Sequence, residues 1–245
     1  WIFKLNQFAI VTPVPKIIEA FIKNSILMKI IDRKVLEIKV FNLRDYGIGN
    51  YKQIDDKPFG GGGGMILRPE PLFRSIDVAM NWIKNKENIR VILTSPGGQK
   101  WDQSAAEKLS MKKNVILLCG HYKGVDERVI DEYVTDQFSI GDYVLTCGEI
   151  PALIIIDSVA RLIPGALNNQ DSALKDSFSY NLLDHPHYTN PRKYRKRNVP
   201  KVLLNGNHKK IDQWRLKFRR SRTINSRPDL WEKFTKVKES ESKNG

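Results

Sequence analysis

The chain has 245 residues, of which 41% are hydrophobic and 28% are charged. This balance is typical of a globular protein and excludes a disordered, collagen-like or coiled-coil chain. The length suits one large domain or two modest ones. Lys and Arg outnumber Asp and Glu by 41 to 27, so the net charge of +14 indicates a polyanionic partner.

The positive charge is concentrated near the end of the chain. Residues 192–245 contain 18 Lys and Arg against 5 Asp and Glu, whereas the preceding residues are almost balanced. The basic run 192–197 also contains Tyr194, and this combination suits RNA, because cations bind phosphates and rings stack on bases. A solvated basic face is the alternative interpretation, and the concentration of charge in one segment argues against it.

Two features predict the cellular compartment. The chain has only two cysteines, Cys119 and Cys147, and no Cys-x-x-Cys pair, which excludes a disulfide framework and a zinc signature. No stretch reaches 18 apolar residues, and the first residues lack a signal-peptide pattern. We therefore expect a soluble cytoplasmic protein without a membrane partner.

Short β-branched runs alternate with segments of helical period along the first two thirds of the chain. The pattern predicts strands at 35–41, 90–94 and 115–119, and helices at 15–30, 69–84, 103–111, 126–135 and 151–162. Asp126 and Glu127 open one of these helices, where carboxylates favour a capping role. The alternation favours an α/β fold with a mostly parallel sheet covered on both faces, and 115–118 fits a buried central strand.

A polar segment at 168–172 follows Pro164-Gly165 and marks a change of composition. We expect a first domain at 1–165, a linker at 166–190 and a basic helical domain at 191–245. In the last of these, Ile211, Trp214 and Phe218 are spaced by three and four residues. This spacing predicts a basic amphipathic helix with Asn207 as its N-cap.

Glycine-containing loops follow several of the predicted elements. The run Gly60–Gly64 is the most unusual, but it matches neither the P-loop nor the dinucleotide fingerprint, so a flexible loop and a binding loop remain equally good interpretations. The loops at 94–98 and 119–124 follow predicted strands, and 139–149 contains two more glycines. Ligands of open α/β sheets bind beyond the carboxyl ends of strands, so the three loops together predict a small-molecule site.

Other candidate residues lie outside these loops. Asp176 is an acid in a polar segment that could act as a general base, although a solvated loop acid is the simpler interpretation. Arg161 either pairs with Asp157 one helical turn earlier or reaches a substrate carbonyl oxygen. His185 and His187 have no third ligand at a recognisable spacing, so we expect no metal site there.

These residues occur in an order that resembles the bacterial tRNA (guanine-N1)-methyltransferases, a family of the SPOUT class. The matching segments cover nearly the whole chain: 55–65, Ser95-Pro96, 119–128, 139–149, 161–165, 176–178, 182–189, 203–208 and Trp214-Arg215. The resemblance implies a SPOUT-type parallel sheet with a deep trefoil knot, followed by a small, mainly helical C-terminal domain. It also implies a homodimer in which the linker and C-terminal module of one subunit complete the active site of the other.

The resemblance implies that the knot loops hold S-adenosyl-L-methionine, the methyl donor. The corresponding residues are Thr94, Ser95, Pro96, Gly120, Tyr122, Ile140, Gly141, Asp142, Tyr143, Val144, Leu145, Gly148 and Pro151. The implied substrate is tRNA, methylated at N1 of the guanosine immediately 3′ of the anticodon. Asp176 would be the general base for the N1 proton and Arg161 would stabilise charge at O6. Residues expected to contact the tRNA are Asp184, His187, Tyr188, Asn207, His208 and Arg215.

The chain departs from the family pattern at a few positions. Lys123 and Lys175 stand where acids are usual, and two ammonium groups near the site put a magnesium requirement in doubt. One hypothesis is that Lys123 or Lys175 replaces the metal. Cys147 stands where glycine is usual. A degenerate tRNA-binding relative without methyl transfer is the alternative function, and a SPOUT enzyme acting on another base or a ribose is a third.

Overall fold

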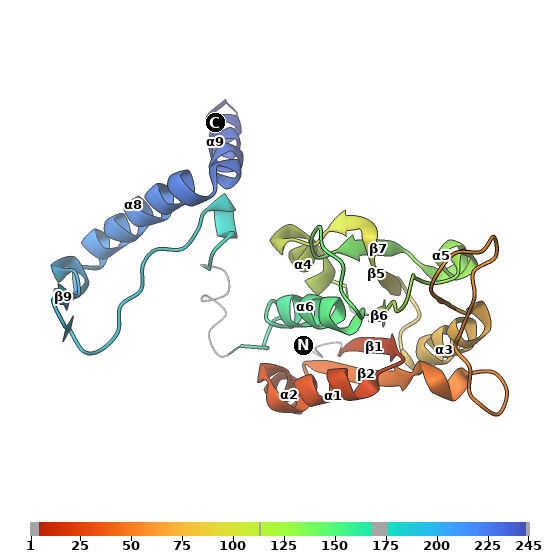
Figure 1. Cartoon of the computed structure of the whole chain (residues 1–245). Coiled ribbons are helices and arrows are strands. Elements are labelled where there is room, and N and C mark those ends of the chain that lie inside the picture. The colour runs from red at the N-terminus through yellow and green to blue at the C-terminus, as the bar shows by residue number, and fades with distance from the viewer. Residues whose placement is uncertain (1–4, 113, 168–175, 244–245) are drawn as a thin grey trace. The chain divides into compact units, whose positions relative to one another are not determined.

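The structure, a computed structural model, describes residues 5–112, 114–167 and 176–243. Backbone contacts divide the chain into two compact units, Trp1–Gln170 and Asp171–Gly245. The first unit is built around a β-sheet with helices on both faces, and the second contains two consecutive helices preceded by an extended segment (Figure 1). The first unit has the α/β fold with a parallel sheet that the alternation of elements predicts.

The central sheet has five strands, all paired in parallel, in the order β2-β1-β6-β5-β7. The strands are β1 (Asn6–Thr12), β2 (Leu36–Asn42), β5 (Arg90–Lys100), β6 (Asn114–Leu118) and β7 (Asp136–Ser139). Every residue of β6 is buried, and this strand is the central one, as predicted. Arg90 and Asp136 form an ion pair that ties β5 to the edge strand β7.

Alternate residues of the strands face two separate layers of helices. Phe8 and Ile10 pack in a core with α1 (Pro15–Asn24), α2 (Ile26–Asp32), α4 (Gln103–Ser110) and α6 (Glu149–Ala160). Ala9 and Val11 pack on the other face with α3 (Pro69–Trp82) and α5 (Glu127–Tyr133). This period of two is the geometry of a strand that is covered on both sides.

The predicted helix at 15–30 is wrong in one respect, because the structure contains two helices there. Ser25 has extended backbone angles, and its hydroxyl accepts a hydrogen bond from the Leu27 N–H at 3.2 Å. The serine therefore ends α1 and caps α2, a role that its side chain performs well. The Asp126 side chain likewise caps α5, as predicted, by accepting from the Arg128 N–H.

Shorter elements complete the first unit. A 3₁₀ turn, η1 (Leu43–Tyr46), follows β2, and a small antiparallel hairpin is formed by β3 (Asp55–Asp56) and β4 (Ile66–Leu67). The glycine run Gly60–Gly64 forms the loop of this hairpin. Leu67 also bridges Val125, so the hairpin is anchored beside the loop that follows β6.

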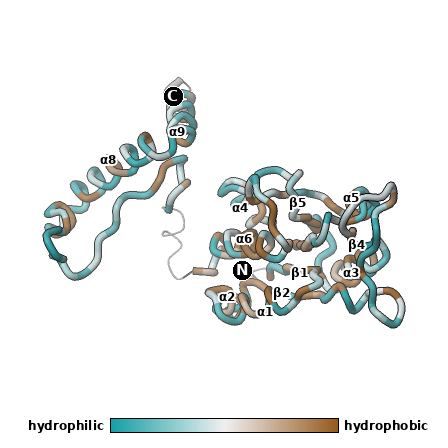
Figure 2. Tube along the Cα trace, in the orientation of Figure 1, coloured by the Kyte–Doolittle hydropathy of each residue, from teal (hydrophilic) through white to brown (hydrophobic). Residues whose placement is uncertain are grey.

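The second unit contains η2 (Ser179–Asn181), the hairpin β8 (Lys193–Tyr194) and β9 (Arg197–Asn198), η3 (Lys201–Leu203), α8 (His208–Ser226) and α9 (Pro228–Lys243). The predicted basic helix is α8, and Asn207 caps it by accepting from the Lys210 N–H at 3.1 Å. In Figure 2, α8 is mostly hydrophilic with hydrophobic residues between. Arg220 lies over the Phe234 ring at 5.9 Å and joins α8 to α9.

Candidate active site

A cavity of about 480 Å³ opens at the carboxyl ends of β6 and β7 and beside the irregular middle part of β5. Its walls come from the three glycine-containing segments that the sequence indicates. The prediction of a loop at 94–98 after a strand at 90–94 is wrong, because these residues lie within β5, where the register shifts between Thr94 and Gln99. Twelve of the thirteen residues expected to hold the methyl donor line it, the exception being Asp142: Thr94, Ser95, Pro96, Gly120, Tyr122, Ile140, Gly141, Tyr143, Val144, Leu145, Gly148 and Pro151. Residues that are up to 57 positions apart in the chain therefore form one continuous surface.

The closest approach between two of these loops requires glycine. A Cβ atom at Gly148 would clash with the backbone of Cys119 and Gly120. The N-terminus of α6 therefore packs directly on the loop that follows β6, and a bare backbone lines the wall between them. Such a wall allows a ligand to approach main-chain N–H and C=O groups, which suits a nucleoside-type group.

Behind this wall lies a hydrogen-bonded group of three side chains from distant parts of the chain. The Glu149 carboxylate is fully buried at the start of α6. It accepts a hydrogen bond from the Thr12 hydroxyl, and His121 Nε2 lies 2.7 Å from its Oε2 atom. The group joins the end of β1, the loop after β6 and the start of α6. Burial by itself raises the pKa of Glu149, but the hydrogen bonds from His121 and Thr12 outweigh it and hold that pKa below its ordinary value.

Lys123 connects the cavity to the glycine run. Its side chain lines the cavity, and a Cβ atom at Gly64 would lie 2.8 Å from Lys123 Cγ. The Lys123 N–H donates to the Met65 carbonyl at 3.0 Å, which fixes the loop beside the end of the run. Gly64 has a φ of +93°, a conformation that favours glycine. The glycine run therefore borders the candidate site at Lys123, which is exposed and also lines the cavity.

The two predicted catalytic residues lie in different units. Arg161 follows the last residue of α6, and its N–H lies 3.5 Å from the Asp157 carbonyl oxygen. Asp176 begins the described part of the second unit, where its carbonyl accepts from the Ser179 N–H at 3.3 Å. Lys175, the second departure from the family pattern, lies outside the described residues.

The residues expected to contact tRNA surround an aromatic cluster on α8. Trp214 lies 4.5 Å from Phe218 and 6.4 Å from Tyr188, measured between ring centroids. Tyr188, Asn207 and His208 are exposed, and so is Arg215, which pairs with Asp212. The second unit thus contains both aromatic rings, which can stack on bases, and exposed basic side chains, which can bind phosphates. This combination is typical of proteins that bind single-stranded RNA.

Asp184 lies beside His185 and His187 and offers a third possible metal ligand, which no spacing in the sequence indicated. One ligand atom from each of Asp184, His185 and His187 lies within 4.8 Å of the others. The carboxylate is already engaged, because it accepts from the His185 N–H at 2.7 Å and lies 2.9 Å from His187 Nε2. Burial raises the pKa of Asp184, but these bonds outweigh it and lower the pKa. Hydrogen bonds among Asp184, His185 and His187 therefore account for the closeness of the three residues without a metal ion.

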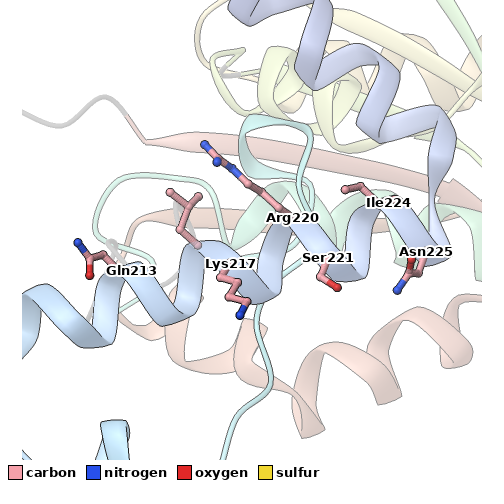
Figure 3. Close-up of a pocket in the computed structure, with 7 residues that line it drawn as sticks. Gln213, Lys217, Arg220, Ser221, Ile224 and Asn225 are labelled. Carbon is pink, nitrogen blue, oxygen red and sulfur yellow. The ribbon is translucent and has the colours of Figure 1, made fainter.

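A second hollow, of about 440 Å³, runs along α8 and is lined by residues of that helix alone. Figure 3 shows Arg220 and Ile224 on one side of the helix and Lys217, Ser221 and Asn225 on the other. It combines two cations with partly exposed apolar side chains. The hollow lacks the convergent segments that line the cavity at the sheet.

The sequence analysis did not identify the roles of Thr12 and His121. Thr12 and Glu149 are separated by 137 positions, so no local pattern relates them. Only the pairing of β1 beside β6 brings the end of β1 under the loop at His121. The signal available in the sequence is Glu149 itself, an acid at the first turn of a largely apolar helix.

Comparisons with known proteins agree with this geometry. A family profile described as tRNA (Guanine-1)-methyltransferase TrmD matches residues 6–233. The chain belongs to this family. A relative from Clostridioides difficile named tRNA (guanine-N(1)-)-methyltransferase is 46% identical over 227 residues, covering 93% of this chain and 98% of the relative. Relatives with the same name from Staphylococcus epidermidis and Alkaliphilus oremlandii are 48% and 45% identical, covering 90% and 95% of this chain and 88% and 94% of their own lengths.

Among the residues that the structure describes, none of the helices combines the length and the apolar character needed to cross a membrane.

Proposed function

We propose that this protein transfers a methyl group from S-adenosyl-L-methionine to N1 of the guanosine immediately 3′ of the anticodon in tRNA. The observation that carries the proposal is the cavity at the sheet, which gathers twelve of the thirteen residues expected to hold the donor. Membership of the tRNA (Guanine-1)-methyltransferase family and the names of the relatives support the same reaction.

The residues of the cavity fit the methyl donor. Gly120 and Gly148 present bare backbone for an adenosine group, while Tyr122, Val144 and Leu145 supply an apolar surface. The bound donor supplies an electrophilic methyl group on a sulfonium. The chain's own residues therefore need only orient the two substrates, remove a proton and stabilise charge.

Asp176 acts as the general base and takes the proton from guanine N1. The electron pair of that N–H bond then forms the new N–CH₃ bond while the C–S bond breaks, leaving a neutral thioether. Arg161 stabilises the negative charge that develops at guanine O6, a task that suits a guanidinium fork. Both residues are carried over from the family pattern, which this chain retains at these two positions.

The protein works as a homodimer of knotted subunits. Ile150 and Ile154 are 45% and 41% exposed, and they lie one helical turn apart on α6. Exposed isoleucines at this spacing form an apolar stripe that a second subunit would bury. In this arrangement each active site is formed by two subunits. One subunit provides the domain at 1–165, and the other completes the site with its linker at 166–190 and its basic domain at 191–245.

The basic domain binds tRNA. Support comes from the exposed hairpin β8–β9, which carries most of the cations of the run 192–197, and from the aromatic cluster on α8. We expect Asp184, His187, Tyr188, Asn207, His208 and Arg215 to form part of this contact.

The residues at the cavity put a magnesium requirement in doubt, and we expect the reaction to proceed without the ion. Lys123 brings an ammonium group to the cavity where the family usually has an acid, so the residues do not favour a divalent cation. Activity in the presence of a chelator should equal activity without it. Activity that a chelator abolishes and magnesium restores would contradict this part of the proposal.

The proposal is tested with labelled S-adenosyl-L-methionine and two unmodified tRNA transcripts, one with guanosine and one with adenosine 3′ of the anticodon. We expect transfer to the guanosine transcript alone. Tight binding of both transcripts without transfer would support the degenerate binding protein instead. Transfer to both would point to another acceptor base or ribose.

A further inference from the structure

The segment that begins with Asp176 is held by the second unit of the chain in a strained turn. Phe178, Tyr180 and Asn181 all have positive φ angles, of 77°, 57° and 57°. Side chains other than glycine seldom adopt this conformation, and aromatic residues pay a real steric cost for it. Such a turn persists only where neighbouring contacts determine its shape.

Within the turn, hydrogen bonds join the residues next to Asp176 to those near Asp184. The Phe178 N–H donates to the Leu182 carbonyl at 2.8 Å, and the Asp184 N–H donates to the Ser177 hydroxyl at 3.0 Å. A movement of the backbone at 182–184 is therefore transmitted to Ser177, the residue beside Asp176.

Helix α8 holds the far side of the turn through two polar side chains. Thr223 is fully buried; its hydroxyl donates to the Arg219 carbonyl and accepts from the Leu183 N–H at 2.8 Å. The Arg219 guanidinium donates to the Leu183 carbonyl at 3.3 Å and to the Ser179 carbonyl at 3.1 Å. Both main-chain groups of Leu183 are thus bound by the helix.

A third contact lies where α8 meets α9. The Arg227 guanidinium lies 5.9 Å from the centre of the Phe178 ring. The turn is therefore held at both ends, by α8 at Leu183 and by the helix junction at Phe178.

We propose that Thr223 and Arg219 are positioning residues for the general base, because they fix on α8 the turn that carries Asp176. This inference rests on the proposed function of Asp176. As a consequence, Asp176 moves together with α8 of the basic domain. When this domain binds tRNA, the base is therefore already held in a fixed geometry.

The test measures the single-turnover rate of methyl transfer at saturating tRNA and donor. Thr223→Val keeps the shape of the side chain and leaves the Leu183 N–H without its acceptor, and we expect it to slow transfer about tenfold. Thr223→Ser keeps the hydroxyl and should retain the rate. Thr235→Val is the matched control, because the Thr235 hydroxyl donates within α9 to the Glu232 carbonyl.

Arg219→Lys provides a second variant, since it keeps the positive charge but loses the fork that joins two carbonyl groups. We expect slower transfer at saturating tRNA with unchanged tRNA affinity. A rate that is normal once tRNA is saturating, or a loss explained wholly by weaker tRNA binding, would overturn the inference in favour of a purely structural role.

A double-mutant cycle separates this inference from the proposed function. If Thr223 acts through the base, Thr223→Val should cause no further loss in an Asp176→Asn background. Equal losses in both backgrounds would overturn the positioning role while leaving the base assignment intact. A full rate for Asp176→Asn alone would overturn the base assignment, and the positioning role with it.

Discussion

Glu149 illustrates at the scale of single residues how a buried acid makes stability depend on pH. Its ordinary pKa is 4.5, and the folded protein holds the pKa lower. Above pH 4.5 the carboxyl is ionised in both the folded and the unfolded chain, so its stabilisation is complete. As the pH falls from there through the folded pKa, the unfolded chain binds the proton first and the stabilisation is lost.

We therefore expect Glu149→Gln to weaken the dependence of the thermal midpoint on pH below about 4.5, relative to the parent protein. The measurement is the midpoint of unfolding between pH 3 and pH 7, about the range in which carboxyl groups titrate. Glu107→Gln is the control, because Glu107 is exposed on α4 and should leave the acid dependence unchanged. Parallel curves for Glu149→Gln and the parent would show that this carboxyl is not the group involved.

Gly148 gives a second prediction at this scale. Gly148→Ala forces the start of α6 away from Cys119 and Gly120, and overpacking of this kind costs about 1–3 kcal/mol. Because both sides of the contact line the cavity, we expect affinity for S-adenosyl-L-methionine to fall about tenfold or more. Calorimetric titration measures it. Gly97→Ala, whose Cβ would meet only the Ser95 hydroxyl at 3.9 Å, should bind the donor normally; equal losses in the two variants would contradict the packing argument.

At the scale of elements, periodicity in the sequence predicts the long amphipathic helices and the apolar central strand, and it fails where polar side chains have structural partners. Strand β1 was not predicted although it is buried throughout, because Asn6, Gln7 and Thr12 flank its apolar residues and leave a run of only four, Phe8 to Val11. The structure explains them: the Gln7 amide donates to Glu37 and accepts from the Lys84 N–H. Such partners are 30 and 77 residues away and leave no local signal.

In the candidate site, too, residues whose partners are distant in the chain could not be predicted from the sequence. The three loops were predicted together because glycines after parallel strands must meet at one edge of the sheet. Thr12, His121 and Thr223 were not, since their roles come from hydrogen bonds to distant segments. The general base and its assignment depend on the family pattern rather than on any property of the local sequence.

The proposed homodimer predicts that the exposed isoleucines of α6 lie in the subunit interface. Ile150→Glu combined with Ile154→Glu places two charges on the exposed apolar stripe, which should prevent a second subunit from packing there. We expect sedimentation velocity to show a monomer, with loss of methyl transfer because each site lacks its partner module. Val78→Glu is the control, since Val78 is 41% exposed on α3, which covers the opposite face of the sheet. A double variant that remains dimeric would exclude α6 as the interface.

At the scale of the whole molecule, charge is divided between the parts of the chain. The first unit carries the cavity with little net charge, while residues 192–245 hold 18 cations against 5 acids. Affinity for tRNA should therefore come mainly from phosphate contacts in the second unit and fall steeply with salt. Under the proposed function, we expect specificity for the guanosine to come from the cavity and from the residues around the methyl donor.

The β8–β9 hairpin allows this division to be measured. Replacing Arg195, Lys196 and Arg197 together by Gln removes three exposed cations from its turn and its second strand. Each lost phosphate contact should reduce the slope of log affinity against log salt by about 1, so we expect a decrease of up to about 3. Lys108→Gln with Lys112→Gln in the first unit is the matched control and should leave the slope unchanged. Because none of these three residues lines the cavity, the triple variant should still methylate at the parent rate when tRNA is saturating. A lower rate at saturating tRNA would mean that the hairpin also orients the substrate.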